Sequence, residues 1–279
     1  MEDNLVYKIL KKEVLNQAVY LMEVEAPYVA ARCEAGQFVI VRIDEDGERI
    51  PLTIADFDRD AKTITIVFQA VGYTTKLMTK LEEGDFLQDF VGPLGKPAPF
   101  ENWNRVVGIA GGVGAAPLYP QLKKLAEKGV SCDVIIGGRS AEFVLFADKF
   151  KEFCDHVYIM TDDGTLGEKG FGVDKLKSLV ANGEKYDHAI AIGPLIMMKF
   201  VVAATKEMNL PTTVSLNPIM IDGTGMCGGC RVTVGGETKF ACVDGPDFDG
   251  FLVDFDECMH RQTFYKEEEH ECMMKMGDK

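Results

Sequence analysis

Three cysteines near the C-terminus lie in or just beyond a glycine-rich stretch, DGTGMCGGCRVTV, at residues 222–234. Cys227 and Cys230 have two residues between them, and eleven more separate Cys230 from Cys242. Thiolates at such spacing bind zinc or iron–sulfur clusters, and glycine backbone offers N–H groups to cluster sulfides. None of the four histidines lies between residues 189 and 259, so the usual zinc ligands are scarce. The pattern favours a [2Fe–2S] cluster, with zinc or an uncommitted thiol cluster as alternatives.

A fourth ligand is suggested by the spacing of plant-type ferredoxins, C-x4-C-x2-C…C. Counting back from Cys227 places Asp222, not a cysteine, at the first position. The predicted metal ligands are Asp222, Cys227, Cys230 and Cys242. A carboxylate oxygen is a harder ligand than a thiolate, so we expect a changed reduction potential, of unassigned sign. The alternative is that Asp222 only caps the loop.

A second glycine cluster, GIAGGVGAAP at residues 108–117, follows an apolar strand pattern and opens a helical one. Glycine lets a phosphate group approach the backbone, and the start of a helix favours negative charge. The predicted nucleotide contacts are Gly111, Gly112, Val113, Gly114 and Pro117. The spacing differs from G-x-G-x-x-G, and tight packing of a strand on a helix would also select such a loop.

Three further turns follow predicted strands: GGR at 137–139, TDDG at 161–164 and GP at 193–194. Ligands of open α/β sheets bind at the carboxyl ends of the strands, so these turns predict one crevice for an extended, phosphorylated ligand. The predicted contacts are Gly138, Arg139, Asp162, Asp163, Gly164, Gly193 and Pro194. For the two aspartates, a solvated turn explains the sequence equally well.

A third candidate site lies in ERIPLTIADFD, residues 48–58. Along a strand, Arg49, Pro51 and Thr53 share one face. A guanidinium and a hydroxyl on one face can clamp a diphosphate or the edge of a ring. The alternative is a surface arginine on a barrel strand. A further anion site is predicted where a helical pattern begins, at Gly72, Thr74 and Thr75.

The element pattern changes along the chain. Up to residue 98, short alternating segments such as KTITIVFQAV predict an antiparallel barrel or sandwich, and VGPLGKPAPF (91–100) predicts a linker. Strand and helix patterns then alternate, which indicates a parallel sheet covered by helices. Leu118, Leu122 and Leu125 mark the first helix. We therefore expect a multidomain chain, with a β-barrel at 1–98, an α/β domain at 99–216, a small metal-binding domain at 217–256 and a charged, solvated tail at 257–279.

The composition disfavours several classes of protein. The 279 residues include 30 Lys and Arg against 44 Asp and Glu, and this net charge of −14 disfavours nucleic acid and anionic membranes as partners. No apolar run is long enough to span a membrane, and the N-terminus has no signal-peptide pattern, so we expect a cytoplasmic protein. Clustered cysteines in such a chain indicate metal or redox chemistry more than disulfides.

The chain closely resembles the ferredoxin-reductase superfamily in RIPLTI, GIAGGVGAAP, GGR, TDDGTLGEKG, AIGPLIMMK and DGTGMCGGCRVTVGGETKFACVDGPDFDG. Within it, the chain is most similar to the small subunits of NADH-dependent reduced ferredoxin:NADP+ oxidoreductases, also called sulfide dehydrogenase subunits. The resemblance implies an FAD-binding barrel, an NAD-binding α/β domain and a [2Fe–2S] domain. Arg49, Leu52 and Thr53 take the places of the family's R-x-Y-S flavin motif, with Leu52 where many relatives have an aromatic residue. Gly72, Thr74 and Thr75 would hold the flavin diphosphate.

The same resemblance implies an electron relay. NADH would reduce the flavin, and single electrons would pass through the cluster to a larger partner in a heterodimer. That partner would carry another FAD, [4Fe–4S] clusters and the NADP(H) site, and the complex would react with ferredoxin. No residue is expected to be a proton-transfer catalyst. The nucleotide choice rests on resemblance, because Arg139 could accommodate a 2′-phosphate.

Three alternatives remain. The chain could be the electron-transfer subunit of a dihydroorotate dehydrogenase. Such subunits normally have four cysteines around the cluster, and this chain has Asp222 in place of the first. It could be a sulfide dehydrogenase subunit, which shares the sequence pattern. It could also be a zinc-stabilised module that senses NAD(H) without turnover.

Overall fold

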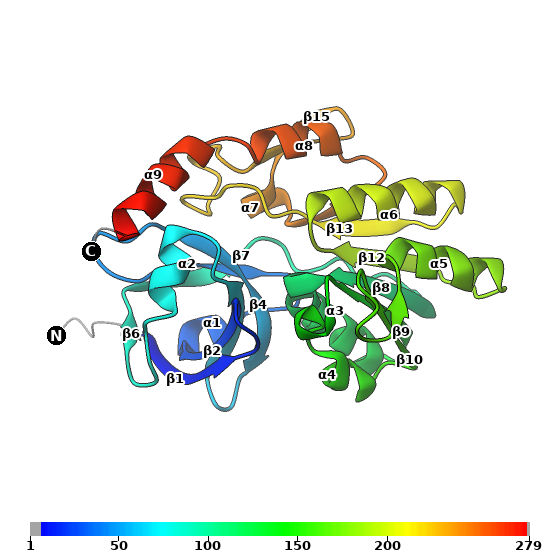
Figure 1. Ribbon diagram of the computed structural model, residues 1–279, viewed down its shortest axis with the longest axis horizontal. Coiled ribbons are helices and arrows are strands. Elements are labelled where there is room, and N and C mark those ends of the chain that lie inside the picture. Colours follow the sequence, from blue (N-terminus) through cyan, green and yellow to red (C-terminus); the bar gives the residue numbers. More distant parts are fainter. Residues whose placement is uncertain (1–6, 278–279) are drawn as a thin grey trace.

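The alternating apolar residues of the N-terminal part form one antiparallel sheet of seven strands, in the order β6-β1-β2-β5-β4-β3-β7. This is a computed structural model, and it describes residues 7–277. The strands are β1 (Tyr7–Val14), β2 (Val19–Glu25), β3 (Phe38–Arg42), β4 (Ile50–Asp58), β5 (Thr63–Gln69), β6 (Phe86–Leu87) and β7 (Asp89–Leu94), with helices α1 (Pro27–Ala30) and α2 (Tyr73–Met78). The sheet curls into a nearly closed barrel (Figure 1). Ile66, Phe68 and Phe90 fill its interior, because alternate residues of a strand face inward.

The linker predicted at residues 91–100 is wrong in its first part. Residues 91–94 belong to β7, which pairs with β3 through Phe38 opposite Leu94 and Ile40 opposite Val91. Because β7 is an edge strand, Pro93 removes no necessary ladder hydrogen bond. The proline and glycine content of this stretch is compatible with an edge strand as well as with a linker.

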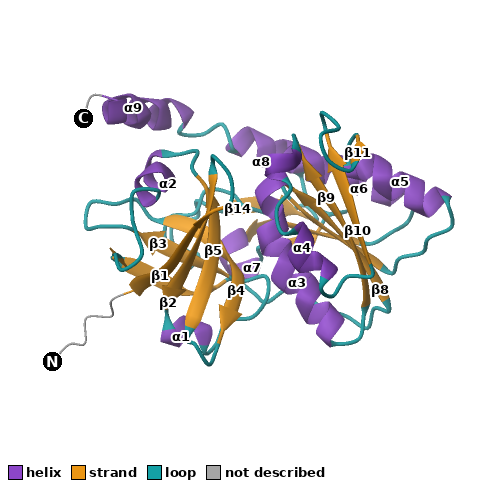
Figure 2. Cartoon of the chain, turned by 60° about the horizontal axis from the view of Figure 1, so that its bottom comes forward, coloured by secondary structure: helices purple, strands orange, loops and turns teal. Residues whose placement is uncertain are grey.

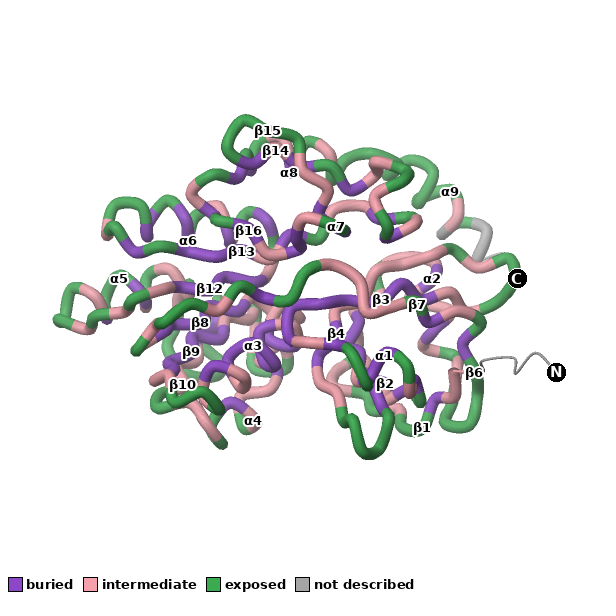
Figure 3. The backbone as a smooth tube through the Cα atoms, turned by 180° about the vertical axis from the view of Figure 1, so that it is seen from behind, coloured by how far each residue is buried: buried purple, intermediate pink, exposed green. Residues whose placement is uncertain are grey.

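The alternating strand and helix patterns form a second seven-stranded sheet, in the order β11-β10-β9-β8-β12-β13-β16. Its parallel strands are β8 (Arg105–Gly111), β9 (Ser131–Gly138), β10 (His156–Thr161), β11 (Glu168–Lys169), β12 (His188–Ile192) and β13 (Thr212–Ser215), and β16 (Asp247–Asp249) is antiparallel to β13. The helices are α3 (Ala115–Glu127), α4 (Ala147–Lys151), α5 (Gly172–Ala181) and α6 (Leu195–Glu207), with 3-10 turns at Gly112–Gly114 and Ala141–Phe143. The central strands β8 and β12 are buried along most of their length (Figure 3).

Helix α3 joins the sheet to the barrel. The three predicted leucines, Leu118, Leu122 and Leu125, are fully buried against the sheet. The opposite side of α3 packs on β4, where Lys123 Nζ lies 3.3 Å from Asp56 Oδ1. Figure 2 shows α3 between the two sheets, and the 3-10 turn that precedes it contacts both β5 and β8.

The C-terminal part lies over the junction of the two sheets (Figure 1). It contains a hairpin of β14 (Arg231–Val234) and β15 (Glu237–Phe240), followed by α7 (Ala241–Asp244), α8 (Phe255–Arg261) and α9 (Lys266–Gly277). The segment predicted as a solvated tail is solvated only in part. Cys258 of α8 is buried, whereas the first turns of α9 are exposed. Helix α9 lies beside α2 of the barrel. In the described part of the chain, no helix is long and apolar enough to cross a membrane.

Candidate metal centre and cofactor-binding sites

The four predicted metal ligands form two pairs. Cys227 Sγ lies 3.2 Å from Asp222 Oδ1, and Cys230 Sγ lies 3.1 Å from Cys242 Sγ. Within residues 7–277, no three or more His, Cys, Asp or Glu side chains are grouped to hold one metal ion. A tetrahedral zinc site needs four ligands around one ion, whereas a two-iron cluster takes two protein ligands on each iron. Two pairs of ligands therefore fit the two-iron cluster better than zinc.

Backbone N–H groups of the loop point at the sulfurs. The Gly229 N–H donates to Cys227 Sγ, and the Cys242 N–H donates to Cys230 Sγ, each over 3.4 Å. Gly225 has φ +87°, and a side chain there would lie 2.8 Å from Val243. The loop is thus held in a conformation that only glycine adopts easily, and its donors suit a core rich in sulfide.

Asp222 uses its two carboxylate oxygens differently. Oδ2 accepts hydrogen bonds from the Met226 N–H over 2.8 Å and from the Thr224 hydroxyl over 3.0 Å, while Oδ1 faces Cys227 Sγ. Burial opposes ionisation of Asp222, but the hydrogen bonds from Cys227, Met226 and Thr224 outweigh it and hold its pKa well below the usual range. The carboxylate therefore caps the loop with one oxygen and keeps the other beside the thiol. Thr224 was missed in the sequence, where a hydroxyl two residues after an aspartate is the available signal.

The two ligand pairs differ in exposure. Cys230 and Cys242 are buried, whereas Cys227 is exposed. Burial raises the pKa of the Cys242 thiol to about 12. Metal binding at this pair must therefore displace a proton, as thiolate sites generally do.

The predicted nucleotide loop forms a 3-10 turn that leads into α3. A side chain at Gly114 would lie 2.2 Å from the Ile192 oxygen, and one at Gly111 would lie 2.5 Å from Met197 Sδ. Close packing of the strand end on its neighbours therefore explains these two glycines without a nucleotide, which is the alternative that the sequence left open. Gly112 differs, because its φ is +55° and a Cβ there would meet nothing within 4 Å. Val113 of this turn and Pro117 of the first turn of α3 are both half-buried.

The other strand ends meet at the same edge of the sheet. Gly111 abuts Pro194, whose Cδ would lie 3.0 Å from a Cβ at that glycine, and Gly193 lies beside it. The Asp162 N–H donates to the Gly138 oxygen over 3.1 Å. The Asp163 N–H likewise donates to the Arg139 oxygen over 3.3 Å. The ends of β8 and β12 are therefore adjacent, as are those of β9 and β10, and a single crevice for one ligand stays a prediction.

The side chain of Asp163 stabilises the turn in which it lies. Its Oδ1 accepts hydrogen bonds from the hydroxyl and the N–H of Thr165, over 2.7 and 2.9 Å, and these bonds lower its pKa. Gly164 continues the turn with φ +77°. For Asp163, the geometry matches the solvated-turn alternative, while the side chains of Asp162 and Arg139 are exposed at the sheet edge.

Arg49 connects the barrel to the metal loop. Its Nε donates to the Ile221 oxygen over 3.0 Å, and its Nη1 lies 3.6 Å from Asp89 Oδ2. The following residues of the flavin motif are half-buried on β4, where Pro51, Leu52 and Thr53 pair with Ile40, Val39 and Phe38. Since Ile221 precedes Asp222, the predicted flavin motif lies next to the first predicted metal ligand.

The predicted diphosphate residues at the start of α2 are engaged within the protein. Thr75 Oγ1 accepts a hydrogen bond from the Gly72 N–H over 3.0 Å. The buried Thr74 donates its hydroxyl to Glu48 Oε2 over 3.0 Å. A phosphate group at this helix start would have to displace or share these bonds, so the role of the three residues stays a prediction.

Comparison with known proteins gives close relatives over the whole chain. Residues 217–254 match the iron-sulfur cluster binding domain of dihydroorotate dehydrogenase B. A homolog of the dihydroorotate dehydrogenase B (NAD(+)) electron transfer subunit from Thermotoga maritima is 45% identical, covering 94% of this chain and 92% of its own. An uncharacterized protein in the adh 3′ region of Clostridium beijerinckii is 53% identical, covering 98% and 95%.

Comparison with solved structures gives the same family and fold. A chain of the NADH-dependent reduced ferredoxin-NADP oxidoreductase, solved for insight into flavin-based electron bifurcation, has a TM-score of 0.92 at 42% identity and 99% coverage of both chains. Phthalate dioxygenase reductase, at 19% identity and a TM-score of 0.63, shares the fold. The predicted fold class is confirmed. The chain has a ferredoxin-reductase-like fold and belongs to the family of oxidoreductase electron-transfer subunits that includes those of dihydroorotate dehydrogenase B and of NADH-dependent reduced ferredoxin-NADP oxidoreductase.

Proposed function

We propose that this chain is the NADH-side electron-transfer subunit of a flavin-based electron-bifurcating NADH-dependent reduced ferredoxin:NADP+ oxidoreductase. It binds FAD on the barrel, NAD(H) at the carboxyl edge of the parallel sheet and a [2Fe–2S] cluster in the loop from Asp222 to Cys242. The observation that carries the proposal is the hydrogen bond from Arg49 to the Ile221 oxygen, over 3.0 Å. It joins the flavin motif to the metal loop, and a relay requires its cofactors to be neighbours.

A bound flavin would supply the hydride-accepting and single-electron chemistry, and a bound cluster would supply a one-electron site. The role of the protein is to bind these cofactors and to orient them. The open turn at Gly112 and the start of the thirteen-residue α3 offer N–H groups to a phosphate. Arg49, the first residue of the flavin motif, places a positive charge beside the metal loop. The N–H groups of Gly229 and Cys242 are available to sulfur. No side chain has to move a proton.

The larger subunit is part of the proposal. The proposed subunit carries a second FAD, [4Fe–4S] clusters and an NADP(H) site. The motifs of this chain do not account for these groups. Ferredoxin would react through that complex. A cytoplasmic location agrees with this role and remains an expectation.

A second candidate is the electron-transfer subunit of a dihydroorotate dehydrogenase. The Thermotoga maritima relative and the match at residues 217–254 favour it. Asp222 favours the bifurcating enzyme, because this carboxylate takes a position that is normally cysteine in the dihydroorotate type. Its Oδ1 faces Cys227 Sγ, as a ligand at that position requires.

The experiment is anaerobic purification of the chain with its native partner, followed by flavin, iron and sulfide analysis. We expect this chain to contribute FAD, two irons and two acid-labile sulfides in addition to those of the partner, together with NADP+ reduction that requires both NADH and reduced ferredoxin. Dihydroorotate-dependent reduction of NAD+ would select the second candidate. Zinc without acid-labile sulfide would contradict both.

A further inference from the structure

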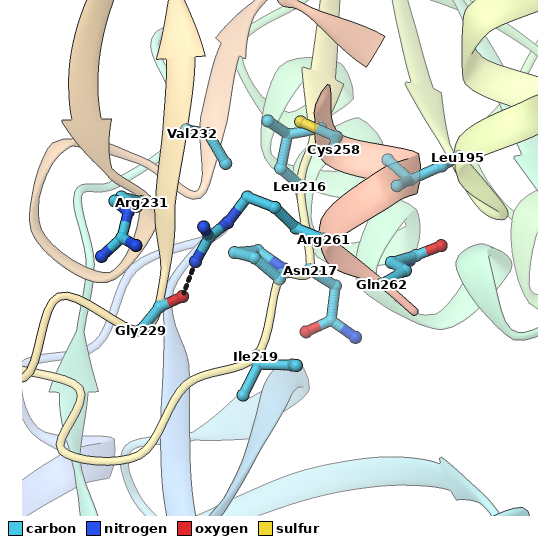
Figure 4. Close-up of a pocket in the computed structure, with 11 residues that line it drawn as sticks. Leu195, Leu216, Asn217, Ile219, Gly229, Arg231, Val232, Cys258, Arg261 and Gln262 are labelled. Atoms are coloured by element: carbon cyan, nitrogen blue, oxygen red, sulfur yellow. Dashed lines mark hydrogen bonds between the residues drawn. The ribbon is translucent and has the colours of Figure 1, made fainter. Parts of the chain in front are cut away.

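Two arginines cap adjacent carbonyl groups of the C-G-G-C segment. Arg231 Nη1 donates to the Gly228 oxygen over 3.3 Å, and Arg261 Nη2 donates to the Gly229 oxygen over 3.0 Å. Arg231 begins β14, immediately after the segment, whereas Arg261 is the last residue of α8. Figure 4 shows Arg261 reaching from α8 to the Gly229 carbonyl. An element distant in sequence thus holds the metal loop.

Helix α8 is anchored so that Arg261 can do this. Asp254 caps its start by accepting a hydrogen bond from the Glu257 N–H over 2.9 Å, and Phe255 and Cys258 are buried. Arg261 itself is half-buried and borders a cavity of about 20 Å³, room for a single water molecule. The helix lies beyond residues 217–254, the part that matches the iron-sulfur domain.

The two hydrogen bonds orient the loop's N–H groups. In a trans peptide the carbonyl and the N–H point in opposite directions. Arg231 holds the carbonyl of the Gly228–Gly229 peptide, and the N–H of that peptide points at Cys227 Sγ over 3.4 Å. Arg261 holds the carbonyl of the next peptide, which is also trans and turns the Cys230 N–H to the opposite side. Arg231 therefore keeps one oxygen away from Cys227 Sγ and the Gly229 N–H toward it, and Arg261 fixes the orientation of the following peptide.

The charges act in the same direction. The loop gathers one carboxylate and three thiols, which bind iron as anions, and every electron accepted there adds negative charge. Arg261 supplies a positive charge one peptide group away, at a half-buried position where water screens it less than at exposed Arg231. Neutralising it should therefore disfavour reduction, and by more than neutralising Arg231.

We propose that Arg261 is a positioning residue for the iron–sulfur loop: its guanidinium fixes the Gly229–Cys230 peptide and raises the reduction potential of the cluster. This inference rests on the proposed function, since it requires the cluster to be bound. The role falls to α8, so a segment outside the cluster-binding motif sets a property of the cluster.

The test uses the complete complex with Arg261→Gln and Arg261→Lys. Arg59→Gln is the matched control, because Arg59 also donates to a carbonyl, that of Cys33 over 2.9 Å, but lies at the far end of β4. We expect Arg261→Gln to lower the reduction equilibrium constant about tenfold, or about 59 mV for one electron, from EPR-monitored redox titration. Arg261→Lys should keep most of the potential but lose iron faster to a chelator. Arg59→Gln should change neither.

Two results would overturn the proposal. One is a wild-type potential together with a wild-type rate of iron loss in Arg261→Gln. The other is an equal shift in Arg59→Gln, which would show a general charge effect. If Arg261→Gln assembles no cluster, Arg261→Lys decides: a potential close to wild type supports the role of the charge, and a shift of about tenfold refutes it. Wild-type complex without iron and sulfide would instead refute the proposed function, so the two failures are distinguishable.

Discussion

A buried carboxylate beside α3 should make the stability of the chain depend on pH. Asp247 begins β16, opposite Ser215 of β13. Its Oδ2 accepts a hydrogen bond from Gln121 Nε2 over 2.9 Å, and its Oδ1 is shut off from solvent without a hydrogen-bond partner. Burial raises the pKa of Asp247 to about 6, although the neighbouring Ser215 side chain and the hydrogen bond from Gln121 act in the opposite direction. Both partners are neutral, so no cation compensates for ionisation.

The sign and size of the effect follow from this pKa. The unfolded chain has the ordinary value of 3.8, so between about pH 4 and pH 6 the folded state binds more protons. The stabilisation is therefore full below pH 4 and is lost as the pH rises through 6. A difference of about two pKa units, at about 1.4 kcal/mol each, gives about 3 kcal/mol, and about half of it is lost above pH 5.

The perturbation is Asp247→Asn, which stays neutral and can still accept the hydrogen bond from Gln121. We expect the variant to gain about 1.5 kcal/mol of stability relative to wild type between pH 5 and pH 7.5. For a chain of this size that is a difference of roughly 3–6 °C in thermal midpoint. The assay is anaerobic thermal unfolding of the holoprotein at each pH. Asp256→Asn is the control, because Asp256 is exposed and pairs with Lys199 at the surface.

Parallel curves of midpoint against pH for wild type and Asp247→Asn would refute this reasoning. They would mean that Asp247 ionises as easily in the folded state as in the unfolded one. A widening gap in Asp256→Asn as well would point to a general charge effect, and the buried carboxyl would not be its cause.

Three further predictions follow from single contacts. Asp222→Cys should change the EPR spectrum of the reduced cluster, and an unchanged spectrum would count against Asp222 as a ligand. Gly114→Ala should lower the thermal midpoint and raise the KM for NADH, since its Cβ would lie 2.2 Å from the Ile192 oxygen; overpacking of this kind costs about 1–3 kcal/mol. Asp133→Asn should cost about 3 kcal/mol in urea unfolding, because fully buried Asp133 accepts a hydrogen bond from Arg105 over 2.8 Å. Its KM for NADH should stay at the wild-type value, since Asp133 lies near the amino end of β9, away from the predicted nucleotide edge.

The layers of the fold could be predicted from the sequence because they depend on local periodicity. The leucines of α3 repeat at helical spacing, and all three are buried. The ligand spacing was informative for the same reason, since the structure pairs Asp222 with Cys227 in one short loop. Glycine content was a weaker guide. It located the turn after β8, but two of its glycines are explained by packing on β12 and α6.

Contacts between distant segments had no local signal. The stretch 91–100 looks like a linker because the partner that makes its first part a strand, β3, lies far earlier in the chain. The hydroxyl of Thr74 looks free until the fold places Glu48 beside it. Arg261 stands in a charged segment, and nothing in its neighbours indicates that it donates to Gly229. Thr224 was missed although its partner Asp222 lies in the same loop, whereas Arg261 was missed because its partner comes from another element.

Hydrogen bonds from side chains of distant elements hold the metal loop, and Arg49 and Arg261 provide two of them. Much of the loop is irregular, and its carbonyls are held from the barrel by Arg49 and from α8 by Arg261. The turn around Gly112 lies between β8 and α3 of the parallel-sheet part and also contacts β5 of the barrel. Perturbing the packing between the parts should therefore disturb the cluster before it disturbs nucleotide binding. Iron loss at constant NADH affinity, under mild urea, is the behaviour that this arrangement requires.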